Sequence, residues 1–250
     1  MRSLEHAVDP RAPLLSDLNK QRALAPGANM SCYFHHVRQE IRPLLPRTAT
    51  SILEIGAASG QTLRWIRTIY PDAMTTGVEI NDAVAEELSR NADVAILGSI
   101  DECLPRLKKY DLILLLDVLE HLVESKAVLQ KVRGLLQPGG HVVVSVPNVA
   151  HLSVAIPLLF KRRFEYQDAG ILDRTHLRFF VEDTAIGLMN DAGLKVSKGL
   201  ISGMQGYKAK TLHRLSFGLL KHHLAKQYIM LGEAIDGEEP QKPFSWRIAE

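Results

Sequence analysis

The sequence LEIGAASG, from Leu53 to Gly60, joins an apolar run to a segment with the spacing of a helix. A strand that turns through glycines into a helix is a common way to hold a nucleotide, because the helix N-terminus and the open backbone N–H groups bind polar or anionic groups. The stretch therefore predicts a nucleotide-binding loop, and the order strand, loop, helix points to an α/β fold.

Two familiar phosphate loops are excluded by the positions of the glycines. The dinucleotide pattern Gly-x-Gly-x-x-Gly, laid on Gly56, fails at Ala58 and at Gln61. A P-loop ends in Gly-Lys-Ser/Thr, whereas residues 60–62 read GQT and offer no lysine to a phosphate. What remains is Glu54 followed by spaced glycines, which suits a ligand with a positive group better than a pyrophosphate.

The rest of the chain alternates between apolar strands and amphipathic helices. Strands are predicted at 50–56, 75–80, 93–97, 111–118, 138–147, 194–204 and 225–234, and helices at 31–46, 60–70, 82–91, 123–136 and 182–193. Continuous apolar strands with helices between them indicate a mostly parallel sheet with helices on both faces.

The chain divides into three parts by composition and period. We expect an N-terminal arm or linker at 1–30, one domain at 31–235 and a polar C-terminal tail at 236–250. Within the domain, residues 148–180 have no clean period and are expected to form a substrate lid.

Bulk composition indicates a soluble protein of the reducing cytoplasm. The 250 residues carry 30 basic and 28 acidic side chains, which give no whole-protein field for nucleic acid or membranes. Cys32 and Cys103 are too few and too isolated for a disulfide framework or a zinc site. No apolar stretch has the length of a signal-peptide core or of a membrane span. We therefore expect neither nucleic-acid binding nor stable membrane insertion.

Four segments follow one another along the chain and read ILEIGAASG, GVEI, YDLILLLDVLEHL and LLQPGGHVVVSVPN. Together, in this order and at these separations, they resemble the class I S-adenosylmethionine-dependent methyltransferases. YFHHVRQEI before the first strand and GILDRTHLRFF after the fifth look like a bacterial small-molecule subgroup, similar to the O-methyltransferases of ubiquinone biosynthesis. The resemblance implies S-adenosylmethionine as cofactor and a Rossmann-like seven-stranded sheet that ends in a C-terminal antiparallel hairpin.

The same resemblance implies a set of cofactor-binding residues. They follow the first four strands or precede the first, and would surround the methionyl, ribose and adenine parts of the cofactor. The set is Glu54, Gly56, Ala57, Ala58, Gly60, Glu79, Ile80, Ser99, Ile100, Asp117, Tyr33 and Arg38.

Four members of this set carry specific expectations. Glu79 ends its strand and is placed to accept hydrogen bonds from a ribose diol. Arg38 is expected to meet the cofactor carboxylate, the alternative being a solvated helix face. Ala58 replaces the frequent middle glycine of the loop, and Ser99 stands where many relatives have an acid that bonds the adenine.

Methyl transfer to a hydroxyl needs an aligned acceptor and usually a base, for which a histidine of near-neutral pKa is the natural candidate. In DRTHLRFF, His176 and Asp173 lie between the fifth strand and the next helix, at the edge where ligands bind. His121 follows the fourth strand, beside the cofactor. These three are the candidate catalytic residues. The alternatives are a structural His176 held by a backbone carbonyl, and a helix-capping role for His121.

Two further polar groups are weighed beside these. Asp117, Glu120 and His121 stand at positions like those that hold a divalent cation in ubiquinone-biosynthetic relatives, and carboxylates with imidazole are fit for that. We nevertheless assign no metal to the protein. Asn148 and His151, just past the fifth strand, are candidates to face the substrate, with packing in a loop as the alternative for His151.

Two basic and apolar segments leave a choice open. Residues 158–166 combine leucines and aromatics with KRR, which fits a pocket wall for an acidic substrate or, more commonly, an amphipathic helix with KRR in solvent. The stretch LHRLSFGLLKHHLAK at 212–226 could touch a membrane surface. We favour packing of its apolar residues on the core, with Lys221, His222 and His223 in water.

The sequence thus predicts an S-adenosylmethionine-dependent methyltransferase for a small molecule, acting most naturally at an oxygen of a sugar, a polysaccharide precursor or a secondary metabolite. Transfer to nitrogen or carbon is one rival, and a cofactor-binding protein without catalysis is another. The near-neutral charge argues against a nucleic-acid substrate. The sequence leaves a homodimer open.

Overall fold

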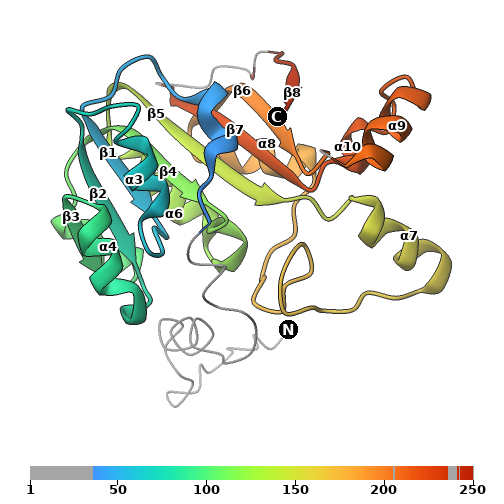
Figure 1. The fold of residues 1–250 in the computed structure, drawn as a ribbon, viewed down its shortest axis with the longest axis horizontal. Helices are drawn as coiled ribbons and strands as arrows, with labels where there is room; N and C mark the ends of the chain where they lie inside the picture. Colours follow the sequence, from blue (N-terminus) through green and yellow to red (C-terminus); the bar gives the residue numbers. More distant parts are fainter. Residues whose placement is uncertain (1–35, 205, 236–240, 242, 250) are drawn as a thin grey trace, which may run out of the picture.

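The computed structural model describes residues 36–204, 206–235, 241 and 243–249. The expected arm at 1–30 and the candidate Tyr33 lie outside these residues. Figure 1 shows a twisted sheet with helices packed on it and two helical segments projecting to one side. No helix in the described part of the chain is both long enough and apolar enough to cross a membrane.

The sheet has eight strands in the order β3-β2-β1-β4-β5-β7-β6-β8. The strands are β1 Ser51–Ile55, β2 Met74–Glu79, β3 Val94–Leu97, β4 Tyr110–Leu116, β5 Leu136–Pro147, β6 Leu194–Ser202, β7 Gln227–Ala234 and β8 Trp246–Ile248. The first five pair in parallel, and β7 runs antiparallel to both β5 and β6. The predicted Rossmann-like sheet with its antiparallel hairpin is confirmed, and β8 joins it as an additional strand.

Helical elements connect these strands, and some of them cover the two faces of the sheet. They are η1 Gln39–Leu44, α3 Gln61–Ile66, η2 Asp82–Val84, α4 Ala85–Asn91, α5 Ile100–Cys103, η3 Leu104–Arg106, η4 Leu119–His121, α6 Ser125–Arg133, α7 Leu152–Lys161, α8 Glu182–Asp191, α9 Tyr207–Leu215 and α10 Lys221–Leu224. The helix expected over 31–46 is described only as the short 3₁₀ helix η1, which contains Pro43. Proline removes a backbone donor and disfavours a longer α-helix there.

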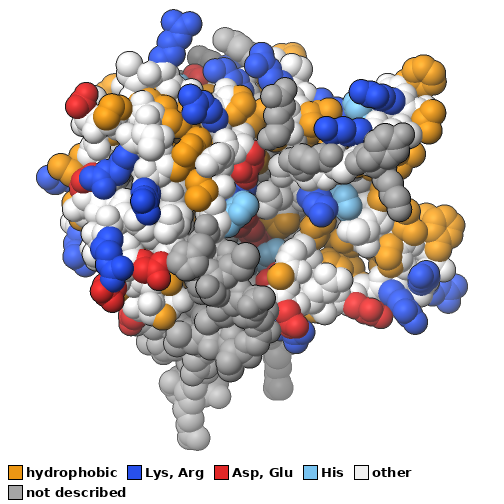
Figure 2. All heavy atoms as spheres, in the orientation of Figure 1, with side chains coloured by type: hydrophobic (Ala, Val, Ile, Leu, Met, Phe, Trp, Pro, Cys, Tyr) orange, Lys and Arg blue, Asp and Glu red, His pale blue; other side chains and the backbone are white. Residues whose placement is uncertain are grey.

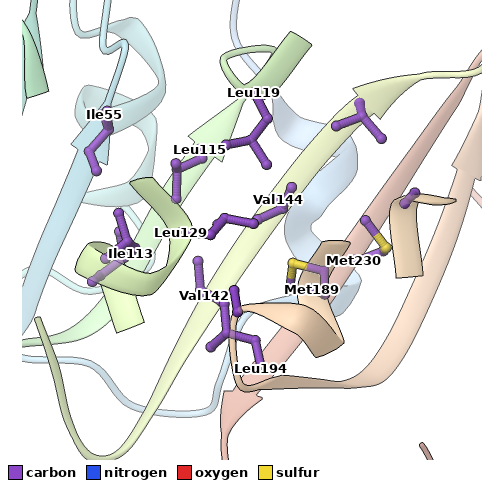
Figure 3. Close-up of a cluster of buried hydrophobic side chains, with 14 of the residues drawn as sticks. Ile55, Ile113, Leu115, Leu119, Leu129, Val142, Val144, Met189, Leu194 and Met230 are labelled. Atoms are coloured by element: carbon purple, nitrogen blue, oxygen red, sulfur yellow. The ribbon is translucent and has the colours of Figure 1, made fainter. Parts of the chain in front are cut away.

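Two hydrophobic clusters lie on opposite faces of the sheet. Within β4, Ile113 and Leu115 belong to one cluster, whereas Leu112 and Leu114 belong to the other. Successive strand side chains point to opposite faces, so a strand covered on both sides must be apolar throughout. Figure 3 shows the first cluster, to which α6 and α8 contribute. Helices η1, α3 and α4 cover the second.

The C-terminal residues differ from the polar tail expected at 236–250. Trp246 in β8 is buried, and its indole Nε1 donates a hydrogen bond of 2.6 Å to Glu182 Oε1. Its ring lies 4.9 Å from that of Tyr228, measured between centroids. Gly199 on the neighbouring strand β6 leaves space for the indole ring, because a Cβ at this position would lie 2.5 Å from it. The buried indole therefore anchors this segment, together with the parallel pairing of β8 with β6.

Replacement of this anchor should destabilise the whole domain. We expect Trp246→Ala to lower the free energy of unfolding by about 3–5 kcal/mol, the usual cost of removing a buried aromatic side chain. The exposed Arg247→Ala on the same strand is the control and should change stability by less than about 0.5 kcal/mol. Urea unfolding of both variants measures the difference, and equal midpoints would show that the segment is a loose tail.

Candidate active site

The glycine loop after β1 sits at the carboxyl edge of the sheet and is bonded to β2. The backbone N–H groups of Gly56 and Ala57 both donate to Val78 O, at 2.8 and 3.0 Å. Gly56 and Gly60 have φ angles of 73° and 76°, in the left-handed region that favours glycine. A Cβ on Gly56 would lie 2.6 Å from Val118 Cγ2. The loop therefore lies directly against the residues that follow β4.

Ala58, the one departure from the expected glycine pattern, carries strain. Its φ is 47°, also left-handed, where an L-residue costs roughly 1–2 kcal/mol. Its backbone N–H donates to Glu79 Oε2 at 2.8 Å. Glu79 also accepts from the N–H groups of Ile80 and Asn81, at 2.9 and 2.8 Å. The carboxylate expected to bind a ribose thus also holds the strained loop in place.

Glu54 is the most unusual carboxyl group of the loop. It is 3% exposed, and its Oε2 has no hydrogen-bond partner among the described residues. The pKa of Glu54 is raised to about 8, mainly because the carboxyl group is buried. The positive charge of Arg38 opposes this shift, and the negative charge of Glu79 adds to it. An unpartnered buried acid at the ligand edge fits a neighbour that carries a positive charge.

Arg38 enters the edge from the residue before η1 and holds Asp117, which follows β4. Its Nη1 donates to Asp117 Oδ2 at 2.5 Å, and its Nε donates to Glu40 at 2.5 Å. Burial alone would lower the pKa of the Arg38 guanidinium. The negative charges of Asp117 and, to a smaller extent, Glu40 outweigh burial and raise this pKa above its ordinary value. Asp117 has a left-handed φ of 58° and also accepts from Ser145 Oγ and Gln227 Nε2, each at 2.9 Å.

The expected adenine neighbours have structural roles of their own. Ser99 caps α5 in a capping box with Glu102, accepting from the Glu102 N–H at 3.4 Å. Its hydroxyl also donates to the Glu102 carboxylate, at 2.8 Å. Ile100 is part of the hydrophobic core. Contact of these two residues with an adenine stays a prediction.

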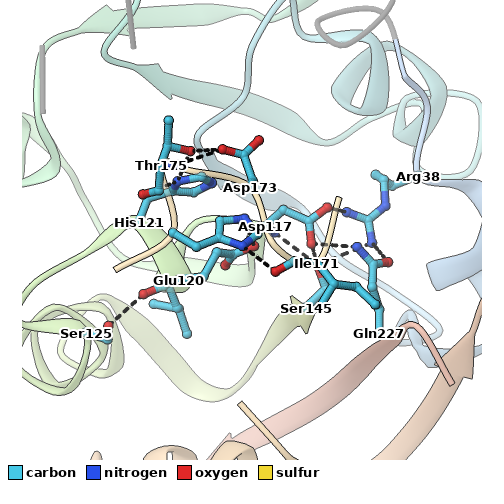
Figure 4. A network of polar contacts seen from close by, with 12 residues as sticks. Arg38, Asp117, Glu120, His121, Ser125, Ser145, Ile171, Asp173, Thr175 and Gln227 are labelled. Carbon is cyan, nitrogen blue, oxygen red and sulfur yellow. Dashed lines mark hydrogen bonds and ion pairs between the residues drawn. The ribbon is translucent and has the colours of Figure 1, made fainter. Parts of the chain in front are cut away.

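Two of the three candidate catalytic residues, Asp173 and His121, are joined through Thr175 in the network of Figure 4. Thr175 Oγ1 donates to Asp173 Oδ1 at 2.6 Å and lies 3.1 Å from His121 Nδ1. Because that hydroxyl proton is directed to Asp173, the hydroxyl accepts from His121, so Nδ1 carries the imidazole proton. Burial lowers the pKa of His121, and His176 lowers it further. His121 is therefore a neutral imidazole whose Nε2 lone pair is free to take a proton.

His176 stands beside His121 with its ring in an edge-to-face contact, 4.8 Å between centroids. Its Nδ1 is 3.0 Å from Ile171 O, and a carbonyl can only accept, so Nδ1 is the protonated nitrogen. Its Nε2 faces Glu120 Oε1 at 4.0 Å. Glu120 is 1% exposed, and burial raises its pKa well above the usual range, with Asp117 adding to the effect.

Glu120, His121 and His176 also form a donor set that could hold a cation. One ligand atom from each lies within 4.8 Å of the others. Both imidazoles donate their Nδ1 protons to backbone or hydroxyl oxygens, the arrangement that orients metal-binding histidines. Asp117, weighed earlier for such a site, is instead engaged with Arg38, and His176 takes its place.

Two other candidates make structural contacts. Asn148 is fully buried and donates to the carbonyls of His222 and Ala225, at 2.7 and 2.8 Å. His151 is the N-cap of α7 and accepts from the Ser153 N–H at 3.1 Å. The capping role weighed for His121 is not seen, because Glu124 is the N-cap residue of α6.

Three contributors were missed by sequence reasoning. Thr175 joins Asp173 to His121, while Ser145 and Gln227 complete the shell around Asp117. Ser145 left a signal, since it is the polar residue in the apolar run HVVVSVP. Gln227 left none, because β7 lies more than 100 residues away along the chain.

Comparison with known proteins places the chain among methyltransferases. A methyltransferase domain family matches residues 31–198. A methyltransferase of Strobilurus tenacellus is 29% identical over 105 residues, which are 42% of this chain and 38% of that protein. The match thus spans well under two thirds of this relative.

Solved structures show the same fold at low sequence identity. An S-adenosylmethionine-dependent methyltransferase from Thermotoga maritima superposes with a TM-score of 0.55 at 18% identity, covering 78% of this chain and 85% of its own. Mitomycin 7-O-methyltransferase gives 0.53 at 15% identity, covering 82% of this chain and 54% of its own.

The buried Glu54 should make stability depend on pH in a defined direction. Between its ordinary pKa of 4.5 and about 8, the folded protein keeps a proton that the unfolded chain has released. The free energy of unfolding therefore falls as pH rises through this window, by up to about 1.4 kcal/mol per pH unit. Glu54→Gln should remove this slope, so its gain over the wild type grows from pH 5 to pH 8.

Urea unfolding at several pH values measures this gain. The exposed Glu124→Gln is the matched control, whose difference from the wild type should stay constant across the series. A constant difference for Glu54→Gln as well would mean that Glu54 is ionised throughout.

Proposed function

The chain belongs to this methyltransferase domain family, and from that membership we propose that it transfers a methyl group from S-adenosylmethionine to an oxygen atom of a small molecule. The observation that carries the choice of oxygen is the neutral imidazole of His121, with its Nε2 free at the carboxyl edge. A hydroxyl must lose its proton to become a good acceptor, and a base of this kind accepts that proton.

The residues of the loop fit the cofactor that the family uses. Glu54 supplies a buried oxygen without a partner, and the loop offers no cation that would repel a sulfonium or an ammonium group. In this proposal Glu54 and the loop residues 56–60 hold the methionyl part, and Glu79 with Ile80 holds the ribose. Ser99 and Ile100 border the adenine, and Arg38 with Asp117 lies at the amino-acid end.

When bound, S-adenosylmethionine supplies a methyl carbon that an acceptor oxygen can attack as the carbon–sulfur bond breaks. The chain's own part is to orient the acceptor, exclude water and receive the acceptor's proton at His121 Nε2. Asp173 acts through Thr175 to keep the His121 proton on Nδ1. His176 and Glu120 flank the same position. Sugars, polysaccharide precursors and secondary metabolites with free hydroxyl groups are the acceptor classes we propose.

Removal of the base should separate binding from turnover. We expect His121→Ala to lower kcat about a hundred- to ten-thousandfold on a hydroxyl acceptor, while the Kd for S-adenosylmethionine from calorimetric titration changes little. Thr175→Val should lower kcat by a smaller factor, because it releases the orientation of the imidazole. His141→Ala, in the middle of β5 beside Glu233 of β7, is the control.

The same measurements distinguish this proposal from its two rivals, methyl transfer to nitrogen or carbon and cofactor binding without catalysis. Full turnover by His121→Ala would exclude it as the base and favour a nitrogen or carbon acceptor that needs no deprotonation there. Cofactor binding by the wild type without turnover on any acceptor would favour the non-catalytic binding protein.

The donor set of Glu120, His121 and His176 favours a second candidate role, the binding of a divalent cation that would orient the acceptor. Proton transfer by His121 needs no metal, so we expect turnover to persist in EDTA and purified protein to hold no stoichiometric metal by elemental analysis. Loss of activity in EDTA that Zn²⁺ or Mn²⁺ restores, together with metal loss in His176→Gln, would establish the cation role instead.

A further inference from the structure

Two segments project from one side of the molecule and form what we call the basic–apolar face. One is residues 152–164, with α7, and the other is residues 206–226, with α9 and α10. Figure 2 shows apolar and basic side chains gathered at the right edge, over these segments. Asn148 joins their bases through its hydrogen bonds to carbonyls of the second segment. The two projections therefore start from neighbouring points on one flank of the molecule.

The tips of both projections expose large apolar side chains. Leu159 and Phe160 at the end of α7 are 74% and 76% exposed. After α9, Phe217 is 95% exposed and Leu219 is 84% exposed. We expected the apolar residues of 212–226 to pack on the core. Leu212 and Leu220 do so, whereas Phe217 and Leu219 are exposed.

Phe217 adopts a left-handed backbone conformation in the turn that follows α9. Its φ is 50°, a conformation that bulky residues rarely adopt, and Gly218 follows with φ 83°. Core packing does not explain an aromatic side chain here, because the side chain is almost fully in solvent. Strained backbone at an exposed large side chain is typical of a functional surface.

The charge of the face is separated from that of the rest of the chain. The two segments hold eight Lys and Arg residues and no Asp or Glu, which leaves 22 basic and 28 acidic residues elsewhere. Exposed cations occur on both projections, among them Lys161, Arg162, Lys210 and Arg214. Acidic residues resume at Glu165, which lies 3.8 Å from Arg163. A near-neutral protein therefore carries one strongly basic flank.

We propose that the basic–apolar face docks on the surface of an anionic lipid bilayer. Leucine and phenylalanine at the tips enter the boundary between headgroups and acyl chains, while the lysines and arginines lie over the lipid phosphates. The exposed Lys161, Arg162, Lys210 and Arg214 beside the apolar tips match this surface better than a protein partner, whose interface would need acidic groups opposite each of them. The docking is peripheral and goes beyond the proposed methyl transfer.

Flotation of the full chain with vesicles tests the proposal. We expect capture by equal parts of phosphatidylcholine and phosphatidylglycerol, and none by phosphatidylcholine alone. Phe217→Ser with Leu219→Ser should lower the partition coefficient about a hundredfold or more, by removing two inserted side chains. Lys161→Gln with Arg214→Gln should lower it about thirtyfold at low salt.

The matched controls lie near the far edge of the sheet. Met74→Ser with Val94→Ser removes exposed apolar side chains of β2 and β3, and Arg106→Gln with Lys108→Gln removes exposed cations. Neither pair should change capture. A wild-type protein that stays with the lipid-free fraction overturns the proposal, as does equal capture of the face variants. A dimer in sedimentation velocity that the Phe217 and Leu219 variant dissolves, without vesicle capture, would assign the face to a second copy instead.

Discussion

The interaction on which the site depends is the ion pair between Arg38 and Asp117. The carboxyl edge gathers several acids that are largely out of water, and Arg38 exerts its charge on Glu54, Asp117 and Glu120. Like charges in a poorly solvated region repel strongly, so without this cation the acids could not share one edge. The residue before η1 is therefore as much part of the site as the strand ends.

This constraint also explains why acids with raised pKa values lie beside a histidine with a lowered pKa at this edge. One arginine cannot neutralise every neighbour, and burial raises the pKa of both Glu54 and Glu120. The same burial keeps His121 neutral. An edge of this kind favours a positively charged ligand, which can draw Glu54 into its ionised form, and retains an imidazole able to accept a proton.

Local pattern was enough to predict the frame of the protein. The apolar run of β4 and the glycine spacing of residues 56–60 act through neighbours close in sequence, and both the parallel sheet and the loop follow from them. For the candidate site, the sequence suggested individual side chains but not the contacts between them. His121, Asp173 and His176 were identified singly, whereas the hydroxyl of Thr175 that links two of them depends on how the segment after β5 folds back. The exposure of Phe217 is likewise a matter of tertiary packing, since an apolar residue in an amphipathic pattern is ordinarily buried.

The position of β7 between β5 and β6 has a consequence for the order in which the molecule can be assembled. During synthesis, β6 emerges before β7 but has no place in the sheet until β7 has paired with β5. Gln227, the first residue of β7, also donates a hydrogen bond to the Asp117 carboxylate. The nascent chain can thus form the parallel half early, yet the shell around Asp117 and the docking of β6 both wait for the late pairing of β7, and β8 can join only after β6.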